Sequence, residues 1–196
     1  MTTTKTTIKK IPGEKELNVL RDECYKIARK HGWHDVERSE RHFLCLVITE
    51  LSEAVEADRK NLHANLEAFN SANGTKHVTW DRSFEGWIKD TVEDELADAA
   101  IRILDLTGVL AVNIGIRVWN AANQHQETLI GYYRKNYSFT EFIYRIVSLL
   151  TYPVRYGEAL FMLFVLADVV GFDLMDHIHL KMEYNKTRER LHGKRY

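Results

Sequence analysis

Cysteine and proline are nearly absent from this chain of 196 residues, which contains two of each. Cys24 and Cys45 form no CxxC pair, so neither a disulfide framework nor a zinc knuckle is expected. We interpret them as reduced thiols of a cytoplasmic protein. Glycine is also scarce, at ten residues. Because proline and glycine are the residues that most often interrupt helices, this composition permits an extensively helical chain.

An excess of charge is missing as well, since 27 Lys and Arg residues face 28 Asp and Glu residues and leave a net charge of −1. Proteins that bind nucleic-acid polymers usually carry a basic face, so we do not expect that function. The most apolar run, residues 159–172, is too short to span a bilayer and contains Asp168, so no membrane association is expected. Residues 1–13 lack the apolar segment of a signal peptide and are interpreted as a flexible tail.

Apolar residues recur at spacings of three and four along most of the chain, which predicts an all-α fold. One helix is expected over residues 14–31. Ser39 is a candidate cap for the next helix, whose apolar stripe ends at Val55. Another stripe runs from Ile88 to Leu110. No alternation typical of a sheet is found, apart from a short extended piece at 77–80.

The remaining segments are less regular. Residues 70–83 are expected to form a loop, with the following helix beginning near Ser83 or later. Residues 111–137 fit either a continued or a broken helix. Ser138 begins a capping-box pattern, a further helix is expected over 157–170, and Asp173 is a candidate cap for the last helix.

Two short acidic signatures carry most of the functional information: Glu50-Leu-Ser-Glu53 and Glu95-Leu-Ala-Asp98. Residues three apart on a helix project from the same side, so each signature presents two carboxylates beside an apolar stripe. Glu56 extends the first face by one turn and Asp105 extends the second by two. Two such helices side by side would bring oxygen ligands together around a hard cation such as Mg²⁺.

An ordinary interpretation stands beside this one. Acidic residues three apart often belong to a solvated helix face, and Arg102 can pair with Asp98 four residues earlier. The last helix carries Lys181, Asn185 and Arg188 on one polar stripe, which suits phosphate and base or sugar contacts. That stripe can equally be a solvated helix whose basic end is favoured by the helix dipole.

The motifs resemble the MazG-like family of all-α NTP pyrophosphohydrolases, which includes dimeric dUTPases and dCTP pyrophosphatases. The resemblance lies in TELSEAVEADRK, in EDELADAAIRILDLTG and in the Lys…Asn…Arg pattern of LKMEYNKTRERLHGKRY, and covers about residues 15–60, 88–108 and 171–195. It implies a single helical-bundle domain over 14–196. The gap of 41 residues between Glu53 and Glu95 and a further insertion depart from the family pattern, so we expect helical insertions at about 61–86 and 110–155.

The same resemblance implies the chemistry. A nucleoside triphosphate would be hydrolysed to a monophosphate and pyrophosphate, with Mg²⁺ as cofactor and Mn²⁺ as a substitute. The implied metal ligands are Glu50, Glu53, Glu95 and Asp98. Glu50 or Glu53 would activate the water, Lys181 and Arg188 would hold phosphates, and Asn185 would contact sugar or base. Family members assemble as homodimers or homotetramers, and the same is expected here.

Three rival functions remain open. His34-Asp35 is the dipeptide of HD-type phosphohydrolases, but further ligands at suitable separations are missing. A ferritin-like di-iron bundle needs two ExxH pairs, and the one pair found, Glu189 to His192, lies in the basic tail. The third is a non-catalytic helical module that binds nucleotides or protein partners without turnover.

Overall fold

The computed structural model of the chain describes residues 11–73, 75, 77–114, 126–152 and 155–195. Within these residues it contains nine α-helices, one 3₁₀ helix and no strand, which confirms the expected all-α class for the described part. The helices are α1 (Glu14–Lys30), α2 (Glu40–Arg59), α3 (Leu66–Asn73), α4 (Trp80–Trp87), α5 (Val92–Val109), α7 (Gln126–Asn136), α8 (Phe139–Leu150), α9 (Tyr156–Val170), α10 (Leu174–Thr187) and the 3₁₀ helix η1 (Arg190–Gly193).

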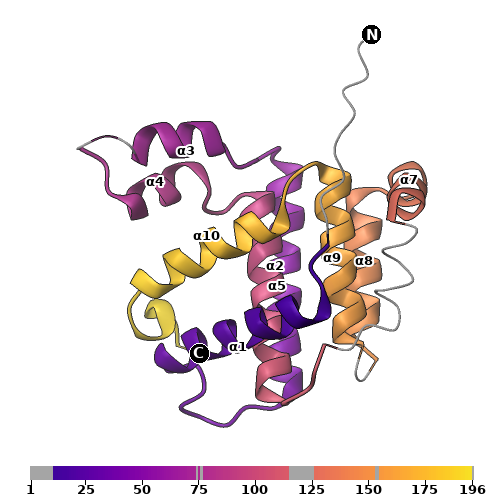
Figure 1. Ribbon diagram of the computed structural model, residues 1–196, viewed down its shortest axis with the longest axis horizontal. Coiled ribbons are helices and arrows are strands. Elements are labelled where there is room, and N and C mark those ends of the chain that lie inside the picture. Colours follow the sequence, from indigo (N-terminus) through magenta and orange to yellow (C-terminus); the bar gives the residue numbers. More distant parts are fainter. Residues whose placement is uncertain (1–10, 74, 76, 115–125, 153–154, 196) are drawn as a thin grey trace.

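Helix α5 lies at the centre of the molecule and packs against α1, α2, α9 and α10 (Figure 1). Helix α8 packs against α2 and α9, and α7 packs against α9. The α3–α4 pair projects from the side of the bundle that lies away from α7 and α8, and α4 contacts the bundle through α10 (Figure 1). Functional side chains on α2, α5 and α10 are therefore held by the most densely connected part of the fold.

Local signals define most helix starts as expected. The Ser39 hydroxyl accepts a hydrogen bond from the His42 amide at 3.3 Å, which caps α2. Ser138 and Glu141 form a complete capping box before α8. Asp173 caps α10 by accepting from the amides of the first turn. These short-range interactions confirm the predicted caps.

Two apolar cores fill the molecule. The main core extends through α1, α2, α5, α8, α9 and α10. A second, smaller core consists of Phe69, Phe84, Ile88 and Tyr184. In it the Phe84 ring stacks on Tyr184 with centroids 4.5 Å apart. This second core fixes the α3–α4 pair against α10.

The prediction of a loop over residues 70–83 was wrong in part, because α3 and α4 occupy both ends of that segment, while residues 75 and 77–79 are not helical. A short helix, α4, begins earlier than expected, at Trp80, and the next long helix begins at Val92, within the expected range of Ser83 or later. No extended piece forms at 77–80. The Thr79 side chain caps α4, and the aromatic side chains of these short helices are buried in the second core. Each helix has only eight residues, too few to show an apolar period.

The interpretation of residues 1–13 as a flexible tail was also wrong in part. Ile11 is buried in the main core, with 3% of its surface exposed. Residues 1–10 lie outside the described part, as do residues 115–125 within the segment whose conformation was left open. Among the helices that the structure describes, none combines the length and the apolar character needed to cross a membrane.

Candidate metal and nucleotide site

The acidic signatures meet where α2 and α5 lie side by side. Carboxylate oxygens of Glu50, Glu53 and Glu95 lie within 4.8 Å of one another. Both helices turn small residues toward the core, among them the fully buried Ala54 and Ala99, and small side chains allow helices to approach closely. The fold thus brings together three of the four predicted metal ligands.

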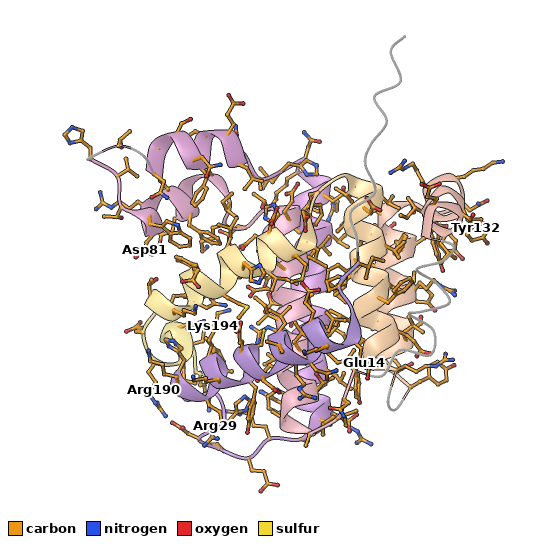
Figure 2. All side chains as sticks on the ribbon, in the orientation of Figure 1. Glu14, Arg29, Asp81, Tyr132, Arg190 and Lys194 are labelled. Atoms are coloured by element: carbon orange, nitrogen blue, oxygen red, sulfur yellow. The ribbon has the colours of Figure 1, made fainter. Side chains whose placement is uncertain are left out.

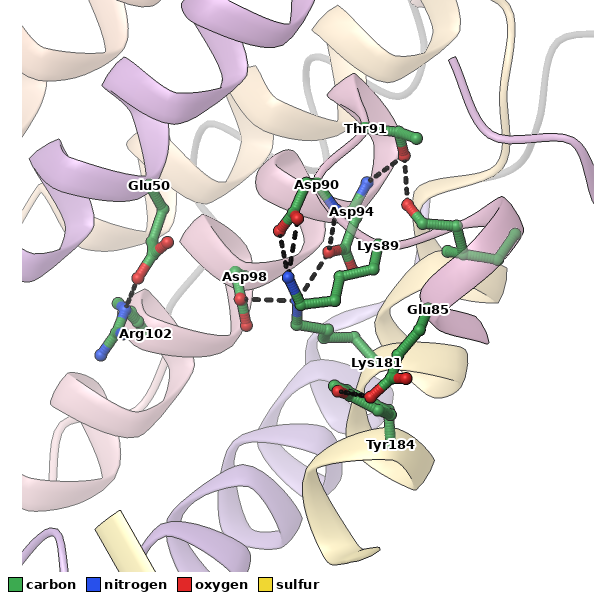
Figure 3. A network of polar contacts seen from close by, with 11 residues as sticks. Glu50, Glu85, Lys89, Asp90, Thr91, Asp94, Asp98, Arg102, Lys181 and Tyr184 are labelled. Carbon is green, nitrogen blue, oxygen red and sulfur yellow. Dashed lines mark hydrogen bonds and ion pairs between the residues drawn. The ribbon is translucent and has the colours of Figure 1, made fainter. Parts of the chain in front are cut away.

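The fourth predicted ligand, Asp98, is engaged differently. Its carboxylate forms an ion pair with Lys181 Nζ at 2.9 Å, and the same ammonium binds Asp94 at 2.7 Å (Figure 3). Asp98 is not part of the three-carboxylate cluster. Lys181, expected to face a phosphate, is instead almost completely buried between two acids of α5.

Arg102 also has a different partner from the one expected. Its Nε donates to Glu50 on the neighbouring helix (Figure 3), not to Asp98 four residues earlier. Asp98 is drawn to Lys181, while Glu50 reaches Arg102 across the contact between α2 and α5. The side-chain pairing is therefore decided by tertiary packing, which spacing along one helix does not show.

Glu95 is the least compensated acid of the cluster. Only 4% of its surface is exposed, and among the described residues its carboxylate has no hydrogen-bond or ion-pair partner. Burial raises the pKa of Glu95 to about 9, and the neighbouring Asp94 and Asp98 add to this effect. A proton or a cation must accordingly be present at this carboxylate near neutral pH.

The pKa values of the other acids shift in opposite directions. Burial, and then the negative charge of Asp98, raises the pKa of Glu50 even though Arg102 opposes the shift. Burial also acts to raise the pKa of Asp98, but Lys181 and Arg102 outweigh it and the pKa is lowered. Asp98 is thus a stable carboxylate, whereas Glu50 and Glu95 favour a further positive charge.

The donor set fits a hard divalent ion. Three carboxylates converge, Glu95 lacks a partner within the described part of the chain, and Glu53 is exposed and keeps the cluster open to solvent. One oxygen of Asp94, Oδ1, is buried without a partner among the described residues. Clustered oxygen ligands with one open side are typical of Mg²⁺ sites, where the ion keeps water or phosphate ligands.

A cavity of about 70 Å³ lies beside Asp98, between α1, α2, α5 and α10. Its lining includes several residues that the sequence singled out, among them Asp98, Arg102, Asp105, Asn185 and Arg188. The cavity has room for about five water molecules, or for a small ring. The polar stripe of the last helix therefore faces the same space as the flank of the acidic helix.

The cavity wall offers buried polar atoms. Asn185 Oδ1, His31 Nε2 and His192 Nε2 are buried and have no partner among the described residues. Burial, followed by the positive charge of Arg188, lowers the pKa of His192 to about 3, so its ring is neutral. The Trp33 ring meets His192 edge to face, with centroids 5.4 Å apart. Together with the apolar lining, these groups suit an uncharged heteroaromatic ring.

Several cationic side chains lie where the C-terminal segment meets α1. Figure 2 shows Arg29, Arg190 and Lys194 where the C-terminal segment meets the end of α1. Leu191 N donates to the His31 carbonyl at 2.9 Å and fixes that segment in place. Lys194 and Arg188 line the cavity itself, so a polyanion that lies between the acids and the C-terminal segment meets several cations.

Two further candidates lie apart from the cluster. Asp105 accepts from, or donates to, His34 Nε2 at 2.8 Å and lines the cavity. Glu56 is exposed and pairs with Arg59 and Lys60 at the surface. The expectation that Glu56 extends the ligand face is therefore not met in this arrangement, because the helix turns its side chain to solvent.

Four aromatic side chains that could stack on a base, Trp33, Trp80, Trp87 and Tyr184, lie in different surroundings. Trp33 lines the cavity, whereas Trp80 stacks on Phe84 in the second core. Trp87 is 44% exposed, and the Tyr184 hydroxyl donates to Glu85. Only Trp33 of these four is placed to contact a ligand in the cavity.

Sequence reasoning missed Asp94, the nearest partner of Lys181, and gave His31 of the cavity wall no role in binding. Asp94 lies within the acidic run before the ExxD signature, and that run was the only signal available. His31 comes from the end of α1, and His192 from η1. Nothing in the linear order indicates that these two rings meet.

The fold and the site define a helical protein with a convergent carboxylate cluster beside a cation-rimmed cavity. Comparison with protein-family models, curated proteins and solved structures finds no match.

Proposed function

We propose that this chain is a Mg²⁺-dependent nucleoside triphosphate pyrophosphohydrolase, which converts a (d)NTP and water into a (d)NMP and pyrophosphate. The observation that carries the proposal is the convergence of Glu50, Glu53 and Glu95 next to a cavity lined by Asn185 and Arg188. Such a site combines ligands for a hard cation with cations for phosphate oxygens. The resemblance of the motifs to the MazG-like family supports the same reaction.

Glu50, Glu53 and Glu95 would hold the ion, and the resemblance adds Asp98. When bound, Mg²⁺ or Mn²⁺ neutralises the triphosphate and the charge that develops on the leaving pyrophosphate. Glu50 and Glu95 carry raised pKa values without such a charge. The same two carboxylates would therefore gain most from a nearby cation.

The chain's own residues divide the remaining tasks. Glu53, the exposed member of the cluster, is best placed to orient or deprotonate an incoming water. Arg188 and Lys194 reach the cavity as cations and would bind phosphate oxygens. Lys181 is occupied by Asp94 and Asp98, so we assign it to positioning Asp98.

The cavity would take the base or the sugar. Its buried polar atoms on Asn185, His31 and His192 are available for hydrogen bonds, and Trp33 supplies an aromatic edge. Canonical and modified bases are both compatible with this lining. The particular base is left to the substrate screen described below.

One observation favours a second candidate, a helical module that binds nucleotides without hydrolysing them. Arg102 already pairs with Glu50, and Lys181 pairs with Asp94 and Asp98. These internal cations satisfy three acids without a metal. A module of this kind would bind the nucleotide through the cavity alone.

The test is a pyrophosphate-release screen over the common NTPs and dNTPs, with Mg²⁺, with Mn²⁺ and with chelator. We expect release from at least one triphosphate, dependent on the metal and lost in Glu53→Gln. In parallel, thermal unfolding with each nucleotide reports binding. Stabilisation by a nucleotide that does not depend on the metal, without pyrophosphate release from any substrate, would favour the non-catalytic module. Absence of both would contradict either function.

A further inference from the structure

Arg102 connects the two halves of the site. Its Nε donates to Glu50 in the acidic cluster, and its side chain also lines the cavity. The guanidinium lies over the Trp33 ring, with its carbon 5.8 Å from the ring centroid. The long side chain of Arg102 therefore lies between the candidate metal ligands and the cavity.

Glu50 is the one acid paired directly with Arg102 among the described residues. Asp98, four residues earlier on α5, is bound to Lys181, and Asp105, three residues later, is bound to His34. Both still act on Arg102 at longer range, because Glu50, Asp98 and Asp105 together outweigh burial and raise its pKa. A guanidinium that leaves Glu50 would stay in a negative field at the cavity wall.

A divalent ion in the cluster and the Arg102 guanidinium compete for the same carboxylate. A doubly charged ion held by three carboxylates attracts Glu50 more strongly than a single guanidinium does. The side chains also differ in freedom: Arg102 is 21% exposed, whereas Lys181 is 5% exposed and has two partners. Displacement by a metal is thus expected at Arg102 and not at Lys181.

We propose that Arg102 is a positioning residue that occupies Glu50 in the metal-free protein and transfers to a phosphate oxygen of the substrate when metal and triphosphate bind together. The proposal rests on the proposed nucleotide function and adds that the binding of metal and the binding of triphosphate are coupled through Arg102. The ion alone must displace Arg102 with no new partner for the guanidinium. The ion with a triphosphate offers that partner, so metal and triphosphate bind cooperatively.

The exchange predicts effects of opposite sign from one substitution. Arg102→Gln removes the competitor, so Mn²⁺ without any phosphate should bind about ten- to a hundredfold more tightly than to the wild type. The same variant lacks the cation that meets the phosphate, so a Mn²⁺–triphosphate complex should bind at least about tenfold more weakly. Arg102→Lys keeps the charge without the planar donors and should lie between the two.

The experiment uses the full chain and two probes, Mn²⁺ alone and a preformed Mn²⁺–inorganic tripolyphosphate complex, which needs no knowledge of the base. Calorimetry measures both affinities for the wild type, Arg102→Gln and Arg102→Lys. Arg145→Gln, an exposed arginine on α8, is the matched control and should change neither affinity. Circular dichroism and the wild-type-like folding of Arg102→Lys separate binding effects from misfolding.

Tighter Mn²⁺ binding together with weaker tripolyphosphate binding supports the exchange. Weaker or unchanged Mn²⁺ binding in Arg102→Gln overturns it, because Arg102 would then be a support for Glu50. Tighter Mn²⁺ binding with unchanged tripolyphosphate binding overturns the transfer step. If the opposite shifts occur but no nucleotide releases pyrophosphate, the proposed reaction fails while the Arg102 exchange stands.

Discussion

Helices α5 and α9 both cross the core, but they bury different side chains. Helix α9 buries an unbroken apolar run from Ala159 to Ala167, and Asp168 is its one buried acid. Helix α5 is also apolar along most of its length, yet its first turn buries Glu93, Asp94 and Glu95 in succession. Burying charge is costly unless each group is paired. A helix that only fills a core has no need of buried acids, so this difference supports the proposed site on α5.

The three buried acids of α5 are accommodated unequally. Glu93 accepts from the Ala64 amide at 2.8 Å and contacts His63 at 3.0 Å. Asp94 binds Lys181, and the positive end of the helix dipole favours acids in this turn. Glu95 has no such partner among the described residues. The residue that resembles a family metal ligand is thus the one left without a partner.

The largest effect is expected from a substitution in the candidate site on α5. Glu95→Gln should lower Mg²⁺-dependent pyrophosphate release by about a thousandfold or more, because several kcal/mol of charge stabilisation depend on the ligand set. Stability of the metal-free protein at pH 7 should be unchanged or higher, since the raised pKa already keeps Glu95 neutral in the fold. Steady-state kinetics and thermal unfolding measure the two effects.

The control for that variant is Glu67→Gln on α3, an exposed acid away from the cluster, which should preserve both rate and stability. Full activity in Glu95→Gln would remove Glu95 from the ligand set. A large loss of stability would mean that the carboxyl is structural.

The next largest effect is expected from a core substitution on α9, which should change stability and not activity. Leu163 is fully buried, so Leu163→Ala should lower the free energy of unfolding by about 2–5 kcal/mol through the cavity it leaves. The rate per folded molecule should stay the same, because α9 contributes nothing to the site. Chemical denaturation measures the free energy of unfolding. Steady-state kinetics at a temperature below the unfolding transition measure the rate per folded molecule. Tyr144→Ala, at a side chain 75% exposed on α8, should change stability by less than about 0.5 kcal/mol.

A smaller effect, on the pH dependence of stability, is expected at His177. His177 is buried beside the Phe172 ring that follows α9, and Glu93 of α5 acts on it electrostatically. Burial lowers the pKa of His177, so the folded protein binds a proton less readily than the unfolded chain. Stability should be fully present above about pH 6.5, the ordinary histidine pKa, and should fall with decreasing pH.

For one such group the slope is at most about 1.4 kcal/mol per pH unit. Denaturation at a series of pH values should therefore show a steeper acid-side loss in the wild type than in His177→Gln. Identical slopes in the two proteins would show that His177 does not contribute to the pH dependence.

Local chemistry explains what the sequence could predict. Helix α8 begins at Ser138 and α10 at Asp173 because the capping side chains lie within a few residues of the amides they accept from. Helical periodicity placed Glu50 and Glu95 beside the apolar stripes, and the structure brings their carboxylates together. These features depend on residues close in sequence or on a regular period.

Tertiary contacts explain what the sequence could not predict. Lys181 reaches Asp94 across 87 positions of the chain, and Arg102 reaches Glu50 across 52. The sequence offered Asp98 as a nearer partner for Arg102, and only the packing of α2, α5 and α10 decides which acid each cation binds. The short α3 and α4 were missed for a related reason, since their aromatic side chains are ordered by contact with Tyr184 on α10.

The most direct test is a crystal structure of the protein grown with Mn²⁺, using anomalous scattering to locate the ion. We predict one or more peaks within bonding distance of Glu50, Glu53 and Glu95, with Arg102 no longer bound to Glu50. Crystals saturated with Mn²⁺ that show no peak among these carboxylates, and Arg102 still paired with Glu50, would contradict the assignment of a metal centre to α2 and α5.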